Sequence, residues 1–126
     1  MSDCKIKICG VTRESDVTLV SNSGADFVGL LVDLPSPRTL DADRAAELSR
    51  FATIPVTLLF FDKPQEQTAA IIDSLSPSVV QLQGHEPPEY VAWLRSRISV
   101  PIWKAVHLPA SGTGEINIDA ALLRIS

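Results

Sequence analysis

Several polar side chains that could take part in catalysis occur inside otherwise apolar segments of the chain. Lys7 and Cys9 are two positions apart in one segment, Gln81 and Gln83 are two apart in another, and Lys104 lies in a third. In an extended strand, residues two apart share a face. A thiol on such a face can remove a carbon-bound proton if nearby positive charge lowers its pKa from about 8.5. A lone cysteine in an apolar strand is more often an inert buried residue, and the glutamines could equally fill a core with satisfied hydrogen bonds.

These side chains belong to a repeating pattern of short apolar segments separated by amphipathic ones. The apolar segments, rich in Val, Ile, Leu and Phe, predict strands over 5–11, 27–32, 56–61, 79–83 and 101–106. The segments between them predict helices over 14–23, 44–51, 65–75 and 89–98. Such alternation predicts an α/β fold with a parallel sheet and right-handed crossovers.

Two architectures fit about five βα units in one domain spanning residues 1–126. One is a doubly wound sheet of the flavodoxin type, and the other is an incomplete (βα)8 barrel of the TIM-barrel family. An open sheet covered by helices on both faces should be apolar on both sides, whereas barrel strands carry polar side chains where they enter an active site. The polar residues inside the predicted strands therefore favour the barrel. The segment 118–125 predicts a fifth helix, with a sixth strand from 121 as the alternative.

Composition excludes several classes of function. The chain has 126 residues, of which 45% are hydrophobic and 21% charged, and its formal net charge is −4. This apolar content argues against disorder, and scattered basic residues give no footprint for nucleic acid or an anionic membrane. No apolar run approaches the roughly 20 residues of a membrane-spanning helix, and the N-terminus does not resemble a signal peptide. We therefore expect a cytoplasmic protein whose two cysteines, Cys4 and Cys9, are reduced thiols.

Motifs at the ends of the predicted strands carry a family resemblance. They are Lys-Ile-Cys-Gly over 7–10 followed by Thr12, Ser-Pro-Arg over 36–38, Gln-Leu-Gln-Gly over 81–84, and Lys104-Ala105. In order and spacing they resemble the N-terminal part of phosphoribosylanthranilate isomerase, an enzyme of tryptophan biosynthesis. The resemblance extends from Lys7 to about Val106. It implies a (βα)8 barrel of which this domain is the N-terminal portion.

The resemblance also implies a reaction. Members of that family catalyse an Amadori rearrangement of N-(5-phosphoribosyl)anthranilate, an aldose-to-ketose isomerisation that requires neither a metal nor an organic cofactor. Cys9 corresponds to the family's general base. Arg38 resembles the arginine that meets the anthranilate end of the substrate, where a planar guanidinium suits a carboxylate. The remaining expected substrate-binding residues are Lys7, Gln81, Gln83 and Lys104.

The sequence departs from the family in two respects. Gln83 occupies the position of the usual histidine, with His85 displaced beyond Gly84, so any role that requires an imidazole at position 83 is in doubt. The family's general acid and its phosphate-binding loops have no counterpart before Ser126. The glycine-rich segment 111–114 could bind an anion or simply connect two elements, and neither Asp119 nor Ser126 is assigned as the acid.

Two other interpretations therefore remain open. The chain could be a non-catalytic half-barrel that binds a ligand or buries its open sheet edges by self-association. It could also be a flavodoxin-like binding domain, although Gly10, Val11, Thr12 and Arg13 do not form a convincing phosphate loop.

Overall fold

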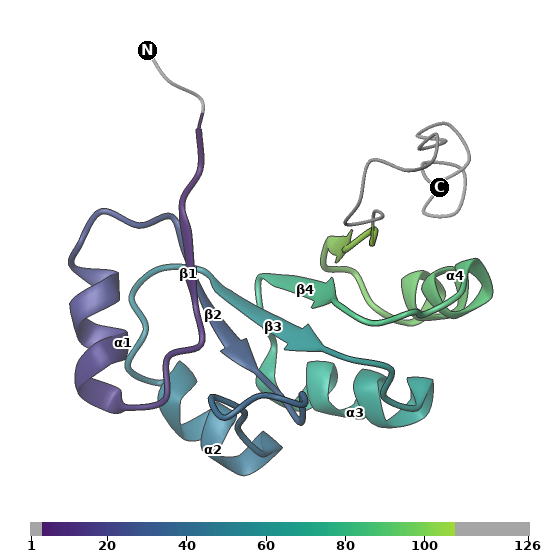
Figure 1. The fold of residues 1–126 in the computed structure, drawn as a ribbon, viewed down its shortest axis with the longest axis horizontal. Coiled ribbons are helices and arrows are strands. Elements are labelled where there is room, and N and C mark those ends of the chain that lie inside the picture. Colours follow the sequence, from purple (N-terminus) through teal and green to yellow (C-terminus); the bar gives the residue numbers. More distant parts are fainter. Residues whose placement is uncertain (1–3, 108–126) are drawn as a thin grey trace, which may run out of the picture.

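The computed structural model describes residues 4–107, which form one parallel β-sheet with its crossover helices (Figure 1). Five strands pair in the order β1-β2-β3-β4-β5. All four pairings are parallel. The strands are β1 (Lys7–Cys9), β2 (Phe27–Leu31), β3 (Val56–Phe60), β4 (Val79–Leu82) and β5 (Ile102–Lys104). Sequential order is the order of a (βα)8 barrel, and it excludes the flavodoxin-like alternative, in which the chain reverses direction across the sheet.

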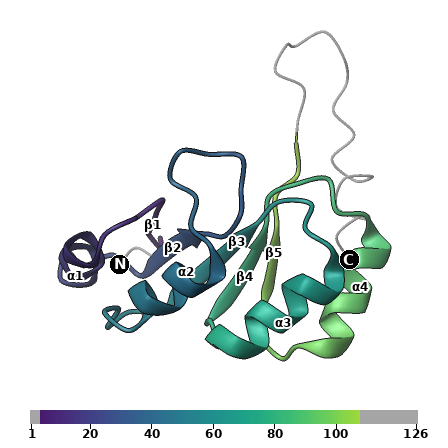
Figure 2. The same cartoon turned by 90° about the horizontal axis from the view of Figure 1, so that it is seen from below.

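The helices all pack on one face of the sheet. They are α1 (Glu14–Ser21), α2 (Ala42–Ser49), α3 (Gln65–Leu75) and α4 (Pro88–Arg97). Each helix contacts the next one along the chain, and Figure 2 shows them in succession along the same side of the strands. A doubly wound sheet would carry helices on both faces. The architecture is therefore that of a partial barrel wall.

The hydrophobic core lies between this wall and the helices. Alternate strand residues such as Val28, Leu30, Leu58 and Phe60 are buried against the helices. They meet apolar helix positions that include Val17, Ala45, Leu48, Ile72 and Leu94. The intervening strand residues point to the opposite face, which corresponds to the inside of a barrel.

Contacts between non-adjacent strands show how strongly the sheet curls. The rings of Phe27 on β2 and Trp103 on β5 meet edge to face with centroids 5.1 Å apart. Lys7 on β1 donates a hydrogen bond to Gln81 on β4, and its Nζ lies 5.8 Å from the centre of the Trp103 ring. A flat sheet would hold these residues several strand spacings of about 4.8 Å apart. The inner face is therefore concave, and β1 and β5 each have a strand neighbour on one side only within residues 4–107.

The predicted elements are confirmed with shorter strands. β1 and β5 contain three residues each. Helix α1 ends at Ser21 with Asn22 as its C-cap, whereas the sequence pattern predicted a helix that continues to Gly24, whose φ is +90°. Asp41 caps α2, because its side chain accepts a hydrogen bond from the Arg44 amide at 2.7 Å. The predicted helix over 118–125 and the glycine-rich segment 111–114 lie outside the described residues.

Candidate active site

The C-terminal ends of the strands surround a pocket of about 310 Å³. In a parallel barrel wall these ends lie on one rim, where loops can converge on a ligand. Cys9 ends β1, Arg38 comes from the loop after β2, and Gln83 follows β4. The complete lining consists of Cys9, Leu31, Leu34, Pro35, Ser36, Arg38, Leu59, Phe61 and Gln83. Three of the six residues expected from the sequence therefore share one cavity, and the rest of its wall is mainly apolar.

Gly29 makes room for the Cys9 side chain. The two residues are register partners on β1 and β2. A Cβ atom added to Gly29 would lie 2.9 Å from Cys9 Sγ and 3.1 Å from a Leu59 methyl group. The thiol therefore lies directly over a bare stretch of backbone. Sequence analysis did not single out Gly29, although a glycine inside an apolar strand is a known sign of close approach.

Gly10 makes room for the Arg38 side chain. Its φ is +82°, a conformation that favours glycine, and an added Cβ would lie 2.5 Å from the Arg38 Nη1 atom. The loop that carries Arg38 is held by its own polar groups, because the Leu34 amide donates to Thr39 Oγ1 at 2.8 Å and the Arg38 amide donates to Ser36 Oγ at 3.2 Å. Gly10 thus allows the guanidinium to lie beside the residue that follows Cys9.

Lys7 and Gln81 pair inside the barrel wall and are absent from the lining of this pocket. Each is two residues before a residue that does line it, so they lie one layer deeper on the same inner face. The Lys7 ammonium donates to the Gln81 side-chain oxygen and faces the Trp103 ring. The floor below Cys9 is therefore polar and carries a positive charge.

The two histidines stack at the rim beside Gln83. Their ring centres are 4.9 Å apart, and His107 Nε2 lies 2.9 Å from the Gln83 carbonyl oxygen. His85 also meets the edge of Phe61, whose ring lines the pocket, at 6.3 Å. Imidazoles thus lie behind the pocket wall, although position 83 itself carries an amide.

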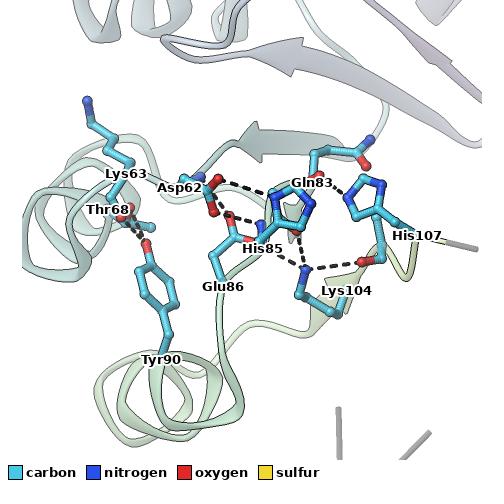
Figure 3. A network of polar contacts seen from close by, with 11 residues as sticks. Asp62, Lys63, Thr68, Gln83, His85, Glu86, Tyr90, Lys104 and His107 are labelled. Carbon is cyan, nitrogen blue, oxygen red and sulfur yellow. Dashed lines mark hydrogen bonds and ion pairs between the residues drawn. The ribbon is translucent and has the colours of Figure 1, made fainter. Parts of the chain in front are cut away.

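Lys104 faces away from the pocket. It alternates with Trp103, so its side chain lies on the helix side of β5, where it is 10% exposed. Figure 3 shows its ammonium group among the loops: Nζ donates to the Gly84 carbonyl at 2.6 Å and to the Ala105 carbonyl at 3.0 Å, and it lies 3.1 Å from Glu86 Oε1. This geometry gives Lys104 no direct access to a ligand in the pocket.

Polar side chains connect each rim loop to the next. Arg44 of α2 binds Glu14 after β1, and Lys63 after β3 binds Asp33 after β2 at 2.7 Å. Asp62 Oδ1 accepts the His85 amide at 2.7 Å, which joins the loops after β3 and β4. Asp33 and Asp62 each follow their strand by two residues and have φ near +50°, a region that aspartate tolerates better than most residues. Sequence analysis missed Asp33, Asp62 and Glu86, because no local pattern marks a contact between loops.

Three titrating groups near the rim have shifted pKa values. The hydrogen bond from Arg44 lowers the pKa of Glu14 below its ordinary value of 4.5, and the same contact raises the pKa of Arg44. Burial raises the pKa of Tyr90, even though its hydroxyl contacts Thr68 Oγ1 at 2.8 Å. Tyr90 also donates to the Lys63 carbonyl at 2.6 Å, so α4 is tied to the start of α3 (Figure 3).

Among residues 4–107, no cluster of three or more His, Cys, Asp or Glu side chains has the arrangement of a metal site. Over the same part of the chain, none of the helices combines the length and apolarity needed to cross a bilayer.

Comparison with known proteins agrees with the fold. A family model described as N-(5'-phosphoribosyl)anthranilate (PRA) isomerase matches residues 6–121. The N-(5'-phosphoribosyl)anthranilate isomerase of Paramagnetospirillum magneticum is 37% identical over 119 residues, which cover 93% of this chain and 54% of the relative. The crystal structure of phosphoribosyl anthranilate isomerase from Thermus thermophilus aligns with a TM-score of 0.75 at 28% identity, over 83% of this chain and 52% of that one.

A further solved structure is relevant because it holds a ligand. It is a phosphoribosyl anthranilate isomerase in complex with reduced 1-(o-carboxyphenylamino)-1-deoxyribulose 5-phosphate. It aligns with a TM-score of 0.73 at 27% identity, over 83% of this chain and 54% of that one. The chain spans about half the length of the relatives it matches.

The sequential sheet, the one-sided helix layer and the pocket at the strand ends define an incomplete (βα)8 barrel with a rim site. The chain belongs to the N-(5'-phosphoribosyl)anthranilate isomerase family.

Proposed function

We propose that this chain forms the N-terminal part of an isomerase that converts N-(5'-phosphoribosyl)anthranilate into the corresponding 1-deoxyribulose 5-phosphate. The observation that carries the proposal is that the Cys9 thiol and the Arg38 guanidinium line the same pocket at the strand ends. In this reaction a base must take a proton from carbon, and a cation must hold the substrate's aromatic carboxylate.

Each side chain has a defined part in the proposed mechanism. Arg38 binds the anthranilate carboxylate through its planar fork, and the apolar wall of Leu31, Leu34 and Phe61 accepts the aromatic ring. After ring opening the substrate is a protonated Schiff base. The Cys9 thiolate removes the proton from C2, the C2–H electrons form a C1–C2 double bond, and the nitrogen is neutralised. The resulting enolamine then tautomerises to the aminoketose.

Lys7 and Gln83 have supporting parts in the proposed mechanism. The Lys7 ammonium lies on the same inner face as Cys9, one layer below the rim, where it donates a hydrogen bond to Gln81. Gln83 supplies an amide on the pocket wall that can bond a substrate hydroxyl. Three further βα units would complete an eight-unit barrel, and we propose that these supply the ring-opening acid and the phosphate loops. Cys4 and Cys9 are not joined by a disulfide, which suits the cytoplasm as the proposed location.

A second candidate function is ligand binding without turnover by a self-associated half-barrel. It is favoured by the pairing of β1 and β5 on one side only within residues 4–107 and by exposed apolar side chains on these strands, Ile8 at 38% and Trp103 at 38%. Unpaired parallel edges are templates for another strand. Turnover by a completed barrel separates the two functions.

Removal of the Cys9 thiol tests the proposed function. Residues 1–107 would be fused to the C-terminal half of the Paramagnetospirillum relative, and consumption of N-(5'-phosphoribosyl)anthranilate would be followed by fluorescence. We expect Cys9→Ala to lower kcat by at least about 10²-fold, since a general base contributes that much. Cys4→Ala is the matched control, because Cys4 lies before β1 and is exposed. Near-normal turnover by a folded Cys9→Ala chimera would contradict the assignment.

A further inference from the structure

The strongest unassigned feature of the molecule is a buried ion pair behind the pocket wall. Glu86 is 3% exposed, and the Lys104 side chain beside it is 10% exposed. Charged side chains are almost never buried to this extent unless they are paired. The proposed reaction uses neither of them directly, because Lys104 lies on the helix side of β5 and Glu86 lies in the loop that precedes α4.

Glu86 Oε2 and Lys104 Nζ each hold a different part of the rim. Glu86 Oε2 accepts the Asp62 amide at 2.9 Å, which fixes the loop after β3. Lys104 Nζ binds the carbonyls of Gly84 and Ala105, which fixes the loop after β4 and the end of β5. Among residues 4–107, Glu86 Oε1 accepts no hydrogen bond, so the ammonium charge 3.1 Å away is what offsets its burial.

The space around the pair leaves little freedom. A Cβ atom on Gly84 would collide with the Asp62 carboxylate, so the loops after β3 and β4 are in direct contact. Asp62 Oδ1 also accepts a hydrogen bond from the His85 amide, which joins the same two loops. Gln83, one residue before Gly84, donates its own amide to the Phe60 carbonyl at 2.8 Å. The position of Gln83 on the pocket wall therefore depends on a turn that is held from the opposite side (Figure 3).

We propose that Glu86 and Lys104 are positioning residues that hold the turn 83–86 and thereby place Gln83 in the pocket. Lys104 thus acts through the loop and not by touching substrate. The proposal rests on the proposed function only in the choice of ligand. The local order of the turn is a separate observable.

Two nearly isosteric variants distinguish positioning from substrate contact. Glu86→Gln keeps an oxygen for the Asp62 amide but removes the charge, and Lys104→Met removes the ammonium group and its carbonyl contacts. Glu47→Gln is the matched control, because Glu47 is an exposed carboxylate whose ion pair with Arg44 lies on α2. All variants are made in the 126-residue chain. Amide hydrogen exchange and binding of reduced 1-(o-carboxyphenylamino)-1-deoxyribulose 5-phosphate are measured for each.

Positioning predicts the same local result for both variants. The amides of Asp62, Gln83 and His85 should exchange at least about tenfold faster. The exchange rate of the Gly10 amide should be unchanged, because this amide donates to the Gly29 carbonyl beside β1, remote from the turn 83–86. Both variants should weaken probe binding by a similar factor, whereas Glu47→Gln should alter neither measurement.

Other outcomes would overturn the proposal. Uniformly faster exchange across the chain would show that the pair only stabilises the fold. Weaker probe binding by Lys104→Met alone would show direct contact with the ligand. Faster local exchange with undiminished probe binding would show that the turn does not control how Gln83 contributes to ligand binding. If the unaltered chain binds no probe, the binding comparison is made in the fusion with the C-terminal half of the Paramagnetospirillum relative, where absence of binding would contradict the proposed function. The exchange pattern at Gln83 in the 126-residue chain decides in either case whether the pair holds the turn.

Discussion

Two glycines provide the space through which the side chains of Cys9 and Arg38 reach the pocket. Gly29 leaves space for Cys9 Sγ, and Gly10 leaves space for the Arg38 guanidinium. Neither glycine carries chemistry itself. Each one allows a functional group to approach the main chain more closely than any other residue would permit. The site therefore depends on absent side chains as well as on the reactive ones.

Replacement of Arg38 tests its proposed contact with a carboxylate. Arg38→Lys keeps the positive charge but loses the bidentate fork, so we expect substrate binding weaker by about 1–3 kcal/mol with the fold unchanged. The measurement is KM in the completed barrel, with circular dichroism as the check on folding. Equal KM values for the two proteins would mean that Arg38 is only a solvated loop residue.

A methyl group at position 29 tests the close packing around the thiol. Gly29→Ala would bring its Cβ to 2.9 Å from Cys9 Sγ, and we expect a loss of about 1–3 kcal/mol in the free energy of unfolding. In a Cys9→Ala background the sulfur is gone, so the same substitution should cost less. Urea denaturation of the four proteins measures this coupling. Identical costs in both backgrounds would show that the thiol is free to move aside.

At the scale of elements, each rim loop is fastened to its neighbour by a charged side chain. Arg44 reaches from α2 to Glu14 and to the Thr12 carbonyl, and Lys63 reaches back to Asp33. Asp62 and Glu86 continue the series to β5. Exposed pairs of this kind contribute little singly, so the partly buried members hold the rim.

The contact between Glu14 and Arg44 predicts a dependence of stability on pH. Because the folded pKa of Glu14 lies below 4.5, the stabilisation is present above the unfolded pKa and is lost as the pH falls through the folded pKa. Wild-type protein should therefore have a higher Tm than Glu14→Gln at pH 7, and the difference should be smaller at pH 3. Thermal unfolding of both proteins at pH 7 and pH 3, repeated at high salt, measures this difference in Tm. A difference that persists undiminished at pH 3 would exclude the ion pair as its source.

At the scale of the whole molecule, the sheet has the curvature of a barrel without closure among the described residues. Phe27 touches Trp103 across the concave face, and within residues 4–107 the outer edges of β1 and β5 are unpaired. Ile6 is 55% exposed and Ile8 38% exposed at the β1 edge. A wall of this shape leaves backbone and apolar groups open to another molecule.

A polypeptide of residues 1–126 on its own should therefore show no measurable isomerase activity. We expect it either to self-associate through the open edges or to be only marginally stable, since the proposed acid and phosphate loops are missing from the wall. The fluorescence assay described above, run with light scattering, tests both parts. Robust turnover by a monodisperse monomer of 13.6 kDa would refute the argument.

Local pattern was enough to predict the sequence of elements and part of the site. Apolar runs and helix signals are properties of neighbouring residues, so the five strands and four helices follow from periodicity, and their ends are displaced by a few positions. Polar residues inside the predicted strands marked Cys9 and Gln83, the family resemblance added Arg38, and these three residues share the pocket. Parallel strands place their C-terminal ends on one rim whatever their exact curvature.

Tertiary structure alone decided the rest. The curl that brings Lys7 to Gln81 and the burial of Glu86 against Lys104 join segments that are far apart in the chain. No local signal distinguishes a lysine that faces a pocket from one that faces the helices, because a shift of one residue along a strand reverses the face. Lys104 was therefore expected at the substrate, and three-dimensional packing instead puts it behind the wall.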